Sequence, residues 1–184
     1  MQGPCDGQGG RLTTMGRRRG GPVGPARITS KVFRYDVGLR WNGEKQGVLS
    51  CEDRSDLPVA SPPEFRGHAG MWTPEHLFVA SVSACTLMTL MSTLVRLGIP
   101  LASYECDATG TLERAEDGVF RFTRVVLKPH IVLTRAEDRQ AVEEAFQKAE
   151  SGCLVTSSLL TTVEAEPHIE VLEGHGPSPP GGAV

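Results

Sequence analysis

The sequence predicts an α+β fold in which antiparallel strands pack around one long, buried helix. The residues from Leu77 to Val95 include no charged side chain, and a helix that is apolar on every face belongs in a protein interior. Segments with alternating apolar and polar residues lie on both sides of this helix, as half-buried strands do. Because helices and strands do not alternate strictly, the order of elements differs from that of a doubly wound α/β protein.

The first strand is predicted at Lys31–Trp41, where apolar and polar residues alternate. Asn42 and Gly43 predict a turn, after which Gly47–Cys51 returns as the partner of a hairpin. The segment from Ser61 to Trp72 is rich in Pro and Gly and is long for a simple connection. Long ordered loops often carry function.

The start of the central helix is marked by three consecutive residues. Thr73 can cap the helix, Pro74 suits its first position, and Glu75 faces the positive end of the helix dipole. We expect the helix to end at Leu97, because Gly98 follows.

This helix is close to the length of a membrane span, about 20 residues. Two features favour a core helix and no membrane: strands are predicted on both sides, and six hydroxyl residues lie inside the helix, namely Ser81, Ser83, Thr86, Thr89, Ser92 and Thr93.

Two long strands, Ser103–Arg114 and Val119–Leu133, follow and are joined at Glu116-Asp117-Gly118. Pro129 predicts that the second strand lies at an edge or bends, because proline cannot donate a backbone hydrogen bond. The sequence Thr134-Arg135-Ala136-Glu137 has the pattern of a capping box.

The capping box predicts a second helix that Gly152 ends, with Cys153 directly after it. Val163–Leu172 is predicted as the last strand.

We expect one folded domain over residues 29–173. Residues 1–28 contain five Arg and one Asp and are predicted to be a disordered basic tail, and residues 174–184 a flexible C-terminal tail. The net charge of −3 therefore combines +4 in the first tail with −7 in the remainder. Such an acidic body argues against nucleic acid as the main partner, although a basic arm that contacts RNA stays an alternative.

The five cysteines do not predict a disulfide framework, because their number is odd and no secretory signal precedes them. A reducing cytoplasm is the expected location. The sequence has no C-x-x-C or H-x-x-x-H spacing and no glycine-rich phosphate loop. No cofactor and no metal site are therefore predicted, and a metal site assembled from scattered Cys and His has no motif to support it.

Three residues are candidates for chemistry: Glu75, Cys85 and Cys153. A cysteine is more often a small core residue than a reactive one. Cys153, however, is predicted between the end of one helix and the start of a short second one, where a thiol pKa can fall. Glu75 is costly to draw into an apolar interface without a purpose.

The stretch WTPEHLFVASVSACTLMTLM, with Cys85 ten residues after Glu75, resembles the signature of the OsmC/Ohr family of thiol-dependent hydroperoxide reductases. The segment Gly152-Cys153-Leu154-Val155-Thr156 is similar to the family's second cysteine motif, with Leu154 in place of Pro and Thr156 in place of Ser. The order of elements agrees over roughly residues 29–173.

The resemblance implies an OsmC-like fold, an intertwined homodimer and a peroxidase that needs no metal or prosthetic group. Cys85 would reduce an organic hydroperoxide to an alcohol and become a sulfenic acid. Cys153 would then form a disulfide with it, which a dithiol reductant, often of the lipoyl type in this family, would reduce. Glu75 would hold a cationic partner beside the sulfur. Cys51 and Cys106 fall in strand patterns and are interpreted as packing residues.

The family's organic hydroperoxide resistance proteins place an activating Arg after the first strand, and here Glu44 stands at that position. Arg40, Lys45 and Arg54 are the candidate substitutes. Three alternatives follow: a non-catalytic OsmC-like binding or stress protein, a general disulfide oxidoreductase, and a nucleic-acid-associated protein that uses the basic tail.

Ten residues of α-helix separate Glu75 from Cys85 by about 15 Å. We therefore expect Glu75 to serve Cys85 of a partner chain. An apolar lining around the cysteine is also expected, made of Val82, Met88 and Thr89 from the helix and of Phe65, Met71 and Trp72 from the preceding loop.

Overall fold

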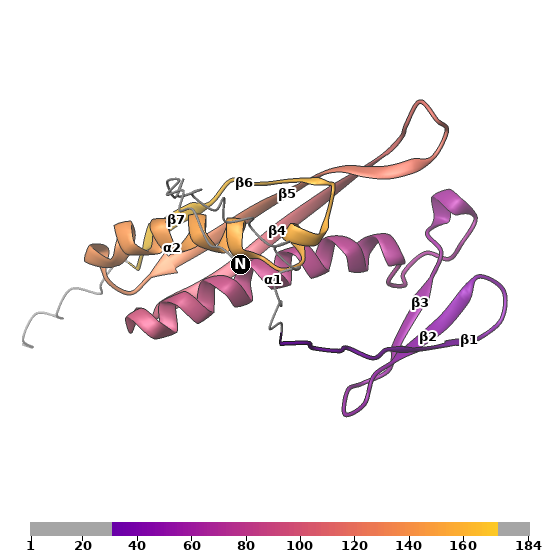
Figure 1. The fold of residues 1–184 in the computed structure, drawn as a ribbon, viewed down its shortest axis with the longest axis horizontal. Helices are drawn as coiled ribbons and strands as arrows, with labels where there is room; N and C mark the ends of the chain where they lie inside the picture. The colour runs from indigo at the N-terminus through magenta and orange to yellow at the C-terminus, as the bar shows by residue number, and fades with distance from the viewer. Residues whose placement is uncertain (1–30, 173–184) are drawn as a thin grey trace, which may run out of the picture. The chain divides into compact units, whose positions relative to one another are not determined.

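The computed structural model describes residues 31–172, and a compact unit begins at Val37. Both predicted tails lie outside the described residues. Within the unit, a small antiparallel sheet has the order β1-β2-β3 and precedes the long helix α1 (Figure 1). A second sheet is built on the hairpin of β4 and β5, and α1 and α2 lie along this hairpin. The α+β class predicted from the sequence is confirmed.

The small sheet consists of β1 (Gly38–Trp41), β2 (Gln46–Ser50) and β3 (Leu57–Ala60). The predicted turn is present, since the backbone N–H of Asn42 donates to the carbonyl of Gln46 at 3.1 Å. The predicted strand Lys31–Trp41 is wrong in its first part, because residues 31–37 have no regular secondary structure. The sequence analysis also missed β3, a short edge strand that contains a proline.

The loop from Ser61 to Trp72 is held by its own backbone. It contains a short 3-10 turn, Pro63–Phe65, and the N–H of His68 donates to the carbonyl of Ser61 at 2.9 Å. A Cβ at Gly67 would lie 1.7 Å from the Ser61 carbonyl oxygen, so only glycine fits at this crossing.

Helix α1 spans Pro74–Leu97, with the ends predicted from the sequence. The Thr73 side chain accepts a hydrogen bond from the N–H of His76 at 3.2 Å, and Gly98 adopts the left-handed conformation at the other end. Hydroxyl groups inside the helix donate to carbonyls of the preceding turn; for example, Thr86 donates to Val82 at 3.0 Å. These bonds explain how the stretch of α1 from Leu77 to Val95, which has no charged residue, tolerates so many polar side chains.

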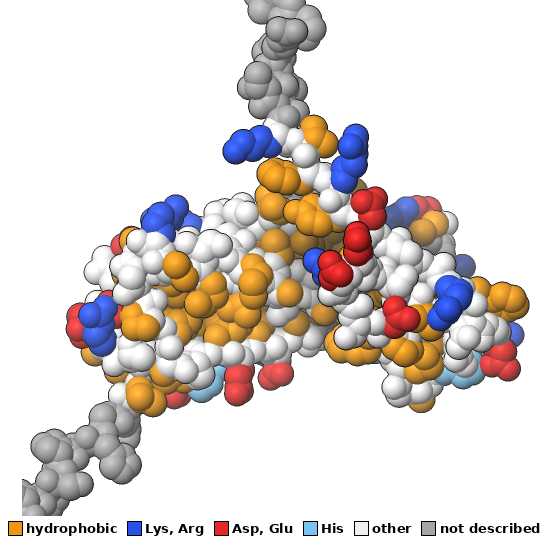
Figure 2. Space-filling view, turned by 90° about the horizontal axis from the view of Figure 1, so that it is seen from below, with side chains coloured by type: hydrophobic (Ala, Val, Ile, Leu, Met, Phe, Trp, Pro, Cys, Tyr) orange, Lys and Arg blue, Asp and Glu red, His pale blue; other side chains and the backbone are white. Residues whose placement is uncertain are grey.

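Only one stripe of α1 is buried in the chain. Its members follow one another at intervals of four residues and are Val82, Thr86, Leu90 and Leu94. On other faces Met88 is 58% exposed and Val95 is 74% exposed. Figure 2 views the molecule from below the orientation of Figure 1 and shows hydrophobic side chains gathered on that surface. The expectation of a helix covered all round is therefore not met within one chain.

The long hairpin consists of β4 (Leu101–Arg114) and β5 (Phe120–Leu133), paired in an antiparallel register. The predicted turn is confirmed: Gly118 has a φ of 80°, and Asp117 forms an ion pair with Arg121 at 2.6 Å. The Arg121 guanidinium lowers the pKa of the exposed Asp117 carboxyl.

The predicted last strand is interrupted and forms two short strands, β6 (Thr162–Ala165) and β7 (His168–Val171). Both pair in parallel with β5, which is therefore central, so the first of the two alternatives for Pro129, an edge strand, is wrong, and the second, a bend, stays a prediction. Pro129 is tolerated because the pairing with β6 ends at Leu127 and the pairing with β7 begins at His130.

Helix α2 spans Arg139–Gly152 and follows a 3-10 turn, Ala136–Asp138. The predicted end at Gly152 is confirmed, but the predicted capping box is wrong. The Thr134 hydroxyl donates to the carbonyl of Pro100 at 3.2 Å, and thus joins two separate segments instead of capping a helix.

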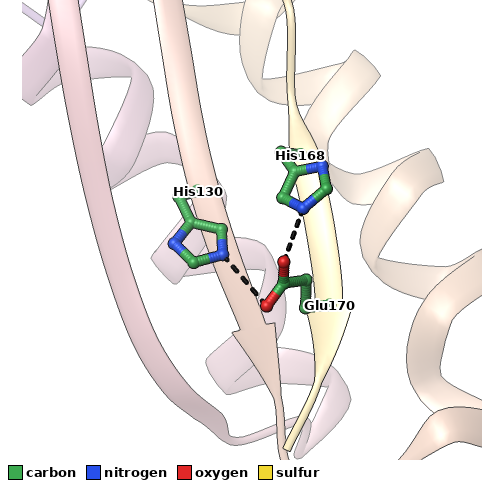
Figure 3. A group of neighbouring side chains, drawn as sticks. All are labelled: His130, His168 and Glu170. Carbon is green, nitrogen blue, oxygen red and sulfur yellow. Dashed lines mark hydrogen bonds and ion pairs between the residues drawn. The ribbon is translucent and has the colours of Figure 1, made fainter.

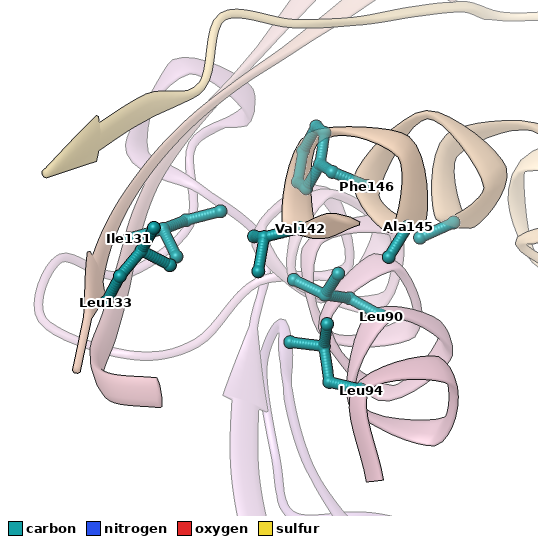
Figure 4. Close-up of a cluster of buried hydrophobic side chains, with 8 residues drawn as sticks. Leu90, Leu94, Ile131, Leu133, Val142, Ala145 and Phe146 are labelled. Carbon is teal, nitrogen blue, oxygen red and sulfur yellow. The ribbon is translucent and has the colours of Figure 1, made fainter. Parts of the chain in front are cut away.

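Two groups of buried side chains fill the space between the helices and the second sheet. The larger group joins α1, α2 and the end of β5 (Figure 4) and consists of Leu90, Leu94, Ile131, Leu133, Val142, Ala145, Phe146 and Ala149. The smaller group lies nearer the start of α1 and consists of Val82, Val125 and Leu127.

We predict that Leu90→Ala lowers the free energy of unfolding by about 3 kcal/mol, because Leu90 is fully buried and its loss leaves a cavity. Leu160→Ala is the matched control, since Leu160 is fully exposed and should change the free energy by less than about 0.5 kcal/mol. Denaturant unfolding measures both values. Equal losses in the two variants would contradict the assignment of the core.

Candidate active site

Cys85 and Cys153 lie where the two core groups meet. On α1, Cys85 is placed between Val82 of the smaller group and Leu90 of the larger one. Cys153 directly follows Gly152, at which α2 ends. A Cβ added to Gly152 would lie 3.8 Å from Cγ2 of Thr89, one helical turn beyond Cys85, so the end of α2 meets α1 close to this cysteine.

The side chain of Cys85 lies close enough to Cys153 to influence the pKa of the Cys153 thiol. Burial raises the pKa of the Cys153 thiol, but the hydrogen bond from Cys85 and donors in the segment after α2 outweigh this effect, so that the pKa is lowered overall. The best defined of these donors is the backbone N–H of Thr156, 3.4 Å from the Cys153 sulfur. Thr156 begins a 3-10 turn, Thr156–Ser158, as the sequence analysis had anticipated for a short helix after Cys153.

The two sulfurs differ in their access to solvent. Cys153 is fully buried, whereas Cys85 is partly exposed. Both are reduced in the structure, as are Cys51 and Cys106. Of the two sulfurs, Cys85 is therefore the one that a solute can reach from solvent.

Glu75 lies in a cavity of about 590 Å³ between the first half of α1 and β4. A Cβ at Gly110 of β4 would come within 2.5 Å of Val79 of α1, which shows how closely the two elements approach. The cavity is mainly apolar, and its lining includes Trp72, Glu75, His76, Val79, Ser83, Leu87, Tyr104, Cys106 and Phe122.

Two buried polar atoms of this cavity have no hydrogen-bond partner among the described residues: Oε2 of Glu75 and the hydroxyl oxygen of Tyr104. Burial, with a smaller contribution from Cys106, raises the pKa of Tyr104 well above its usual value, so that Tyr104 stays a neutral donor. An unpaired carboxylate oxygen in an apolar cavity is costly. It creates a strong preference for an incoming donor or cation.

Glu75 and Cys85 are not brought together within one chain. α1 continues without a break from Pro74 to Leu97, so the helix separates the two residues by about 15 Å. The expected lining of Cys85 is also divided: Trp72 contributes to the cavity at Glu75, and Phe65 packs edge-on against Phe120 at 5.7 Å. The expectation that the loop contributes to the lining of Cys85 stays a prediction.

The three basic residues considered as substitutes for the family Arg have different surroundings. Nη1 of Arg54 lies 3.3 Å from the sulfur of Cys51. Arg40 borders a small cavity beside β2. The ammonium of Lys45 donates to the carbonyl of Phe65 at 2.5 Å, and Lys45 shares a cavity of about 450 Å³ with Pro74. Lys45 is thus the one placed beside the start of α1.

Glu44, which occupies the position of the family Arg, forms an ion pair with His68 at 3.0 Å. Glu44 also has a positive φ of 44°, which fits its place in the tight turn between β1 and β2. Position 44 therefore carries a carboxylate, which contacts His68 in the loop from Ser61 to Trp72.

A family model described as OsmC-like protein matches residues 67–167. The chain belongs to the OsmC-like protein family. It is 28% identical over 124 residues to Peroxiredoxin OsmC of Escherichia coli, covering 65% of this chain and 85% of that protein. It is 22% identical over 136 residues to the uncharacterized protein YmaD of Bacillus subtilis, covering 72% of this chain and 90% of that protein.

Solved structures show the same OsmC-like fold. An OsmC-like protein of unknown function from Vibrio cholerae has a TM-score of 0.68 at 21% identity, covering 74% of this chain and all of that one. An organic hydroperoxide resistance protein from Elizabethkingia anophelis has a TM-score of 0.57 at 22% identity, covering 76% of this chain and 96% of that one. In this chain α1, which is long and apolar enough to span a membrane, packs as a helix of this fold against β4 and α2.

Some features of the OsmC-like site were missed by sequence reasoning. The donor at Thr156 is a backbone group, which any residue supplies, so no side-chain pattern marks it. Tyr104 enters the cavity because alternate residues of β4 face α1, and only the register of the strand could have indicated this.

We predict that Cys85→Ala raises the pKa of Cys153, because the variant removes a hydrogen bond that favours the Cys153 thiolate. The thiolate of Cys153 should then form at higher pH than in the wild type. The pH dependence of the ¹³Cβ chemical shift of Cys153 measures this. Cys51→Ala, in the segment directly after β2, should leave the titration unchanged, and an unchanged titration in Cys85→Ala would contradict the influence of Cys85 on Cys153.

Proposed function

We propose that this OsmC-like protein is a thiol-dependent peroxidase that reduces organic hydroperoxides to alcohols. The observation that carries the proposal is the proximity of the partly exposed Cys85 to the buried Cys153: the end of α2 meets α1 within one helical turn of Cys85, and Cys85 helps to lower the pKa of Cys153. Two thiols in contact can be converted into a disulfide with little movement of the backbone. Similarity to Peroxiredoxin OsmC supports the same chemistry.

In the first step the Cys85 thiolate attacks one oxygen of the hydroperoxide, and the O–O bond breaks. The alkoxide leaves and takes up a proton to become the alcohol, and Cys85 becomes a sulfenic acid. The Cys153 thiolate then attacks the Cys85 sulfur, and the S–O bond breaks; hydroxide leaves, takes up a proton from solvent to become water, and a disulfide remains. An external dithiol, for example of the lipoyl type, reduces this disulfide by exchange and restores both thiols.

The division of roles follows from access and pKa. A bulky peroxide cannot reach the fully buried Cys153 first, whereas Cys85 is open to solvent on one side. The donors after α2, among them the backbone N–H of Thr156, are still present once Cys85 is oxidised and continue to favour the Cys153 thiolate that attacks. No metal or prosthetic group takes part in these steps.

We further propose that the working unit is a homodimer in which each site joins two chains. The apolar faces of α1 left uncovered by its own chain, with Met88 and Val95 exposed, supply a surface for a second copy. In the small sheet, Trp41 is 74% exposed and likewise lacks cover. A twofold arrangement would bring Glu75 of one chain to Cys85 of the other, twice per dimer.

In such a dimer, Lys45 is the best candidate for the cation between Glu75 and the reactive sulfur, because it already lies beside Pro74. A non-catalytic OsmC-like binding protein is the second candidate function. It is favoured by Glu44, which forms an ion pair with His68 where the family's resistance proteins have the activating Arg.

Incubation with cumene hydroperoxide and a dithiol tests the proposal directly. We expect the wild type to consume the peroxide and Cys85→Ser to be inactive, since it lacks the nucleophile. After a stoichiometric pulse without reductant, peptide mapping should find a Cys85–Cys153 disulfide, with Cys51 and Cys106 reduced. No peroxide consumption by the wild type would favour the binding protein, and a dominant bridge to Cys51 or Cys106 would refute the pairing.

In the proposed dimer the Glu75 cavity of one chain lies at Cys85 of the other. Organic hydroperoxides should then be preferred over hydrogen peroxide, because Trp72, Val79 and Phe122 give this cavity an apolar lining. An aryl tail that buries about 80 Å² there gains about 2 kcal/mol, or roughly thirtyfold in kcat/KM. Steady-state kinetics with the two substrates measure the ratio. Equal kcat/KM values would contradict an apolar substrate site.

Subunit mixing tests whether Glu75 acts across the dimer. Chains carrying Glu75→Gln are combined with chains carrying Cys85→Ser under conditions that exchange subunits. If Glu75 acts on the partner chain, each mixed dimer regains one intact site, and activity returns. If it acts within its own chain, neither chain carries both residues and the mixture stays inactive.

A converse mixture guards against incomplete exchange. A chain with both substitutions is mixed with the wild type. A mixed dimer should then lose both sites if Glu75 acts across the dimer, whereas half-activity per mixed dimer, with no rescue in the first mixture, would exclude that arrangement.

A further inference from the structure

Two histidines and a glutamate gather on the second sheet, on the face turned away from the helices (Figure 3). His130 comes from β5, and His168 and Glu170 come from β7. The parallel register places His130 directly beside His168. Since side chains two residues apart on a strand share a face, Glu170 lies on the same side as His168.

The three side chains converge on one another. Nε2 of His168 lies 2.6 Å from Oε1 of Glu170, and Nε2 of His130 lies 3.4 Å from Oε2 of the same carboxylate. The two imidazole rings are stacked with centroids 5.3 Å apart. One potential ligand atom from each of the three residues lies within 4.8 Å of the other two.

The contact between His130 and Glu170 does not supply a hydrogen bond to Nε2 of the His130 imidazole. Nε2 of His130 is buried, and its 3.4 Å contact lacks the geometry of a hydrogen bond, so this nitrogen has no hydrogen-bond partner among the described residues. A buried nitrogen without a partner is costly to leave unsatisfied. When it carries no proton, its lone pair is free to bind a ligand between the three side chains.

We propose that His130, His168 and Glu170 form a binding site for a divalent transition-metal cation, with Zn²⁺ as the probe. Two imidazole nitrogens and one carboxylate oxygen suit Zn²⁺, Co²⁺, Ni²⁺ or Cu²⁺, whereas Mg²⁺ and Ca²⁺ prefer sets of oxygen ligands. Three protein ligands leave a fourth position of a tetrahedral ion for water.

This cation site is separate from the thiol pair. His130 alternates along β5 with Ile131, whose buried side chain packs against α1 and α2, so His130 points to the opposite face of the sheet. Its effect is structural: a cation held by His130 on one side and by His168 and Glu170 on the other would tie the short strand β7 to β5.

Calorimetric titration of the reduced, full-length protein with Zn²⁺ at neutral pH tests the site. We expect one Zn²⁺ per chain at this position and a rise in Tm, because a ligand that binds only the folded state stabilises it. His130→Gln, His168→Gln and Glu170→Gln should each weaken binding by more than about tenfold, since losing even an outer partner of a metal ligand costs about that much.

His68→Gln is the matched control. His68 also faces a carboxylate, Glu44, at 3.0 Å, but this pair offers two groups and not three. The control should bind Zn²⁺ as the wild type does. Far-ultraviolet circular dichroism of each variant without metal checks that weaker binding does not reflect a loss of the fold.

Cysteines also bind Zn²⁺, and two further measurements separate them from this site. Imidazole NMR signals of His130 and His168 should shift on addition of one equivalent of Zn²⁺, and the Co²⁺ form should lack a thiolate-to-metal charge-transfer band. Undiminished binding in the double variant H130Q/H168Q, a thiolate band, or no Zn²⁺ binding by the wild type would each overturn the proposal.

Discussion

The packing of α1 is the constraint on which the rest of the molecule depends. Its buried stripe, from Val82 to Leu94, organises both core groups and thereby positions β5 and α2. The remaining apolar faces are not covered by any part of the chain between residues 31 and 172, and each Å² of apolar surface left in water forgoes about 25 cal/mol. One helix thus forms the core, carries Cys85, and presents the surface at which we propose that a second copy binds.

The thiol pair owes its properties to the junction between the two core groups. Burial alone would raise the pKa of Cys153, but the end of α2 and the following turn direct donors at its sulfur. Similar reasoning applies at Glu75, where the cavity removes solvent without supplying a partner for Oε2. Both arrangements keep an acidic group in apolar surroundings. Donors lower the pKa of Cys153, whereas Oε2 of Glu75 has no donor among the described residues and favours an incoming one.

Features set by neighbouring residues could be predicted from the sequence, whereas features set by distant contacts could not. Thr73 and Gly98 mark the ends of α1 because capping is local. Thr134 failed as a cap because its hydroxyl bonds to Pro100, and Pro129 lies in a central strand because two separate strands pair around it. The cysteines were singled out by their motifs, but the cluster at His130 depends on the pairing of β5 with β7, which no spacing in the sequence indicates.

The proposed dimer requires that a second copy of the chain covers the exposed face of α1. Sedimentation equilibrium of the untagged, full-length protein at micromolar concentration measures whether it does. We expect a mass of twice 19.8 kDa for the wild type, and a shift toward the monomer in Met88→Lys, which puts a charge on the exposed apolar face. A wild-type protein that sediments as a monomer at this concentration would contradict the claim.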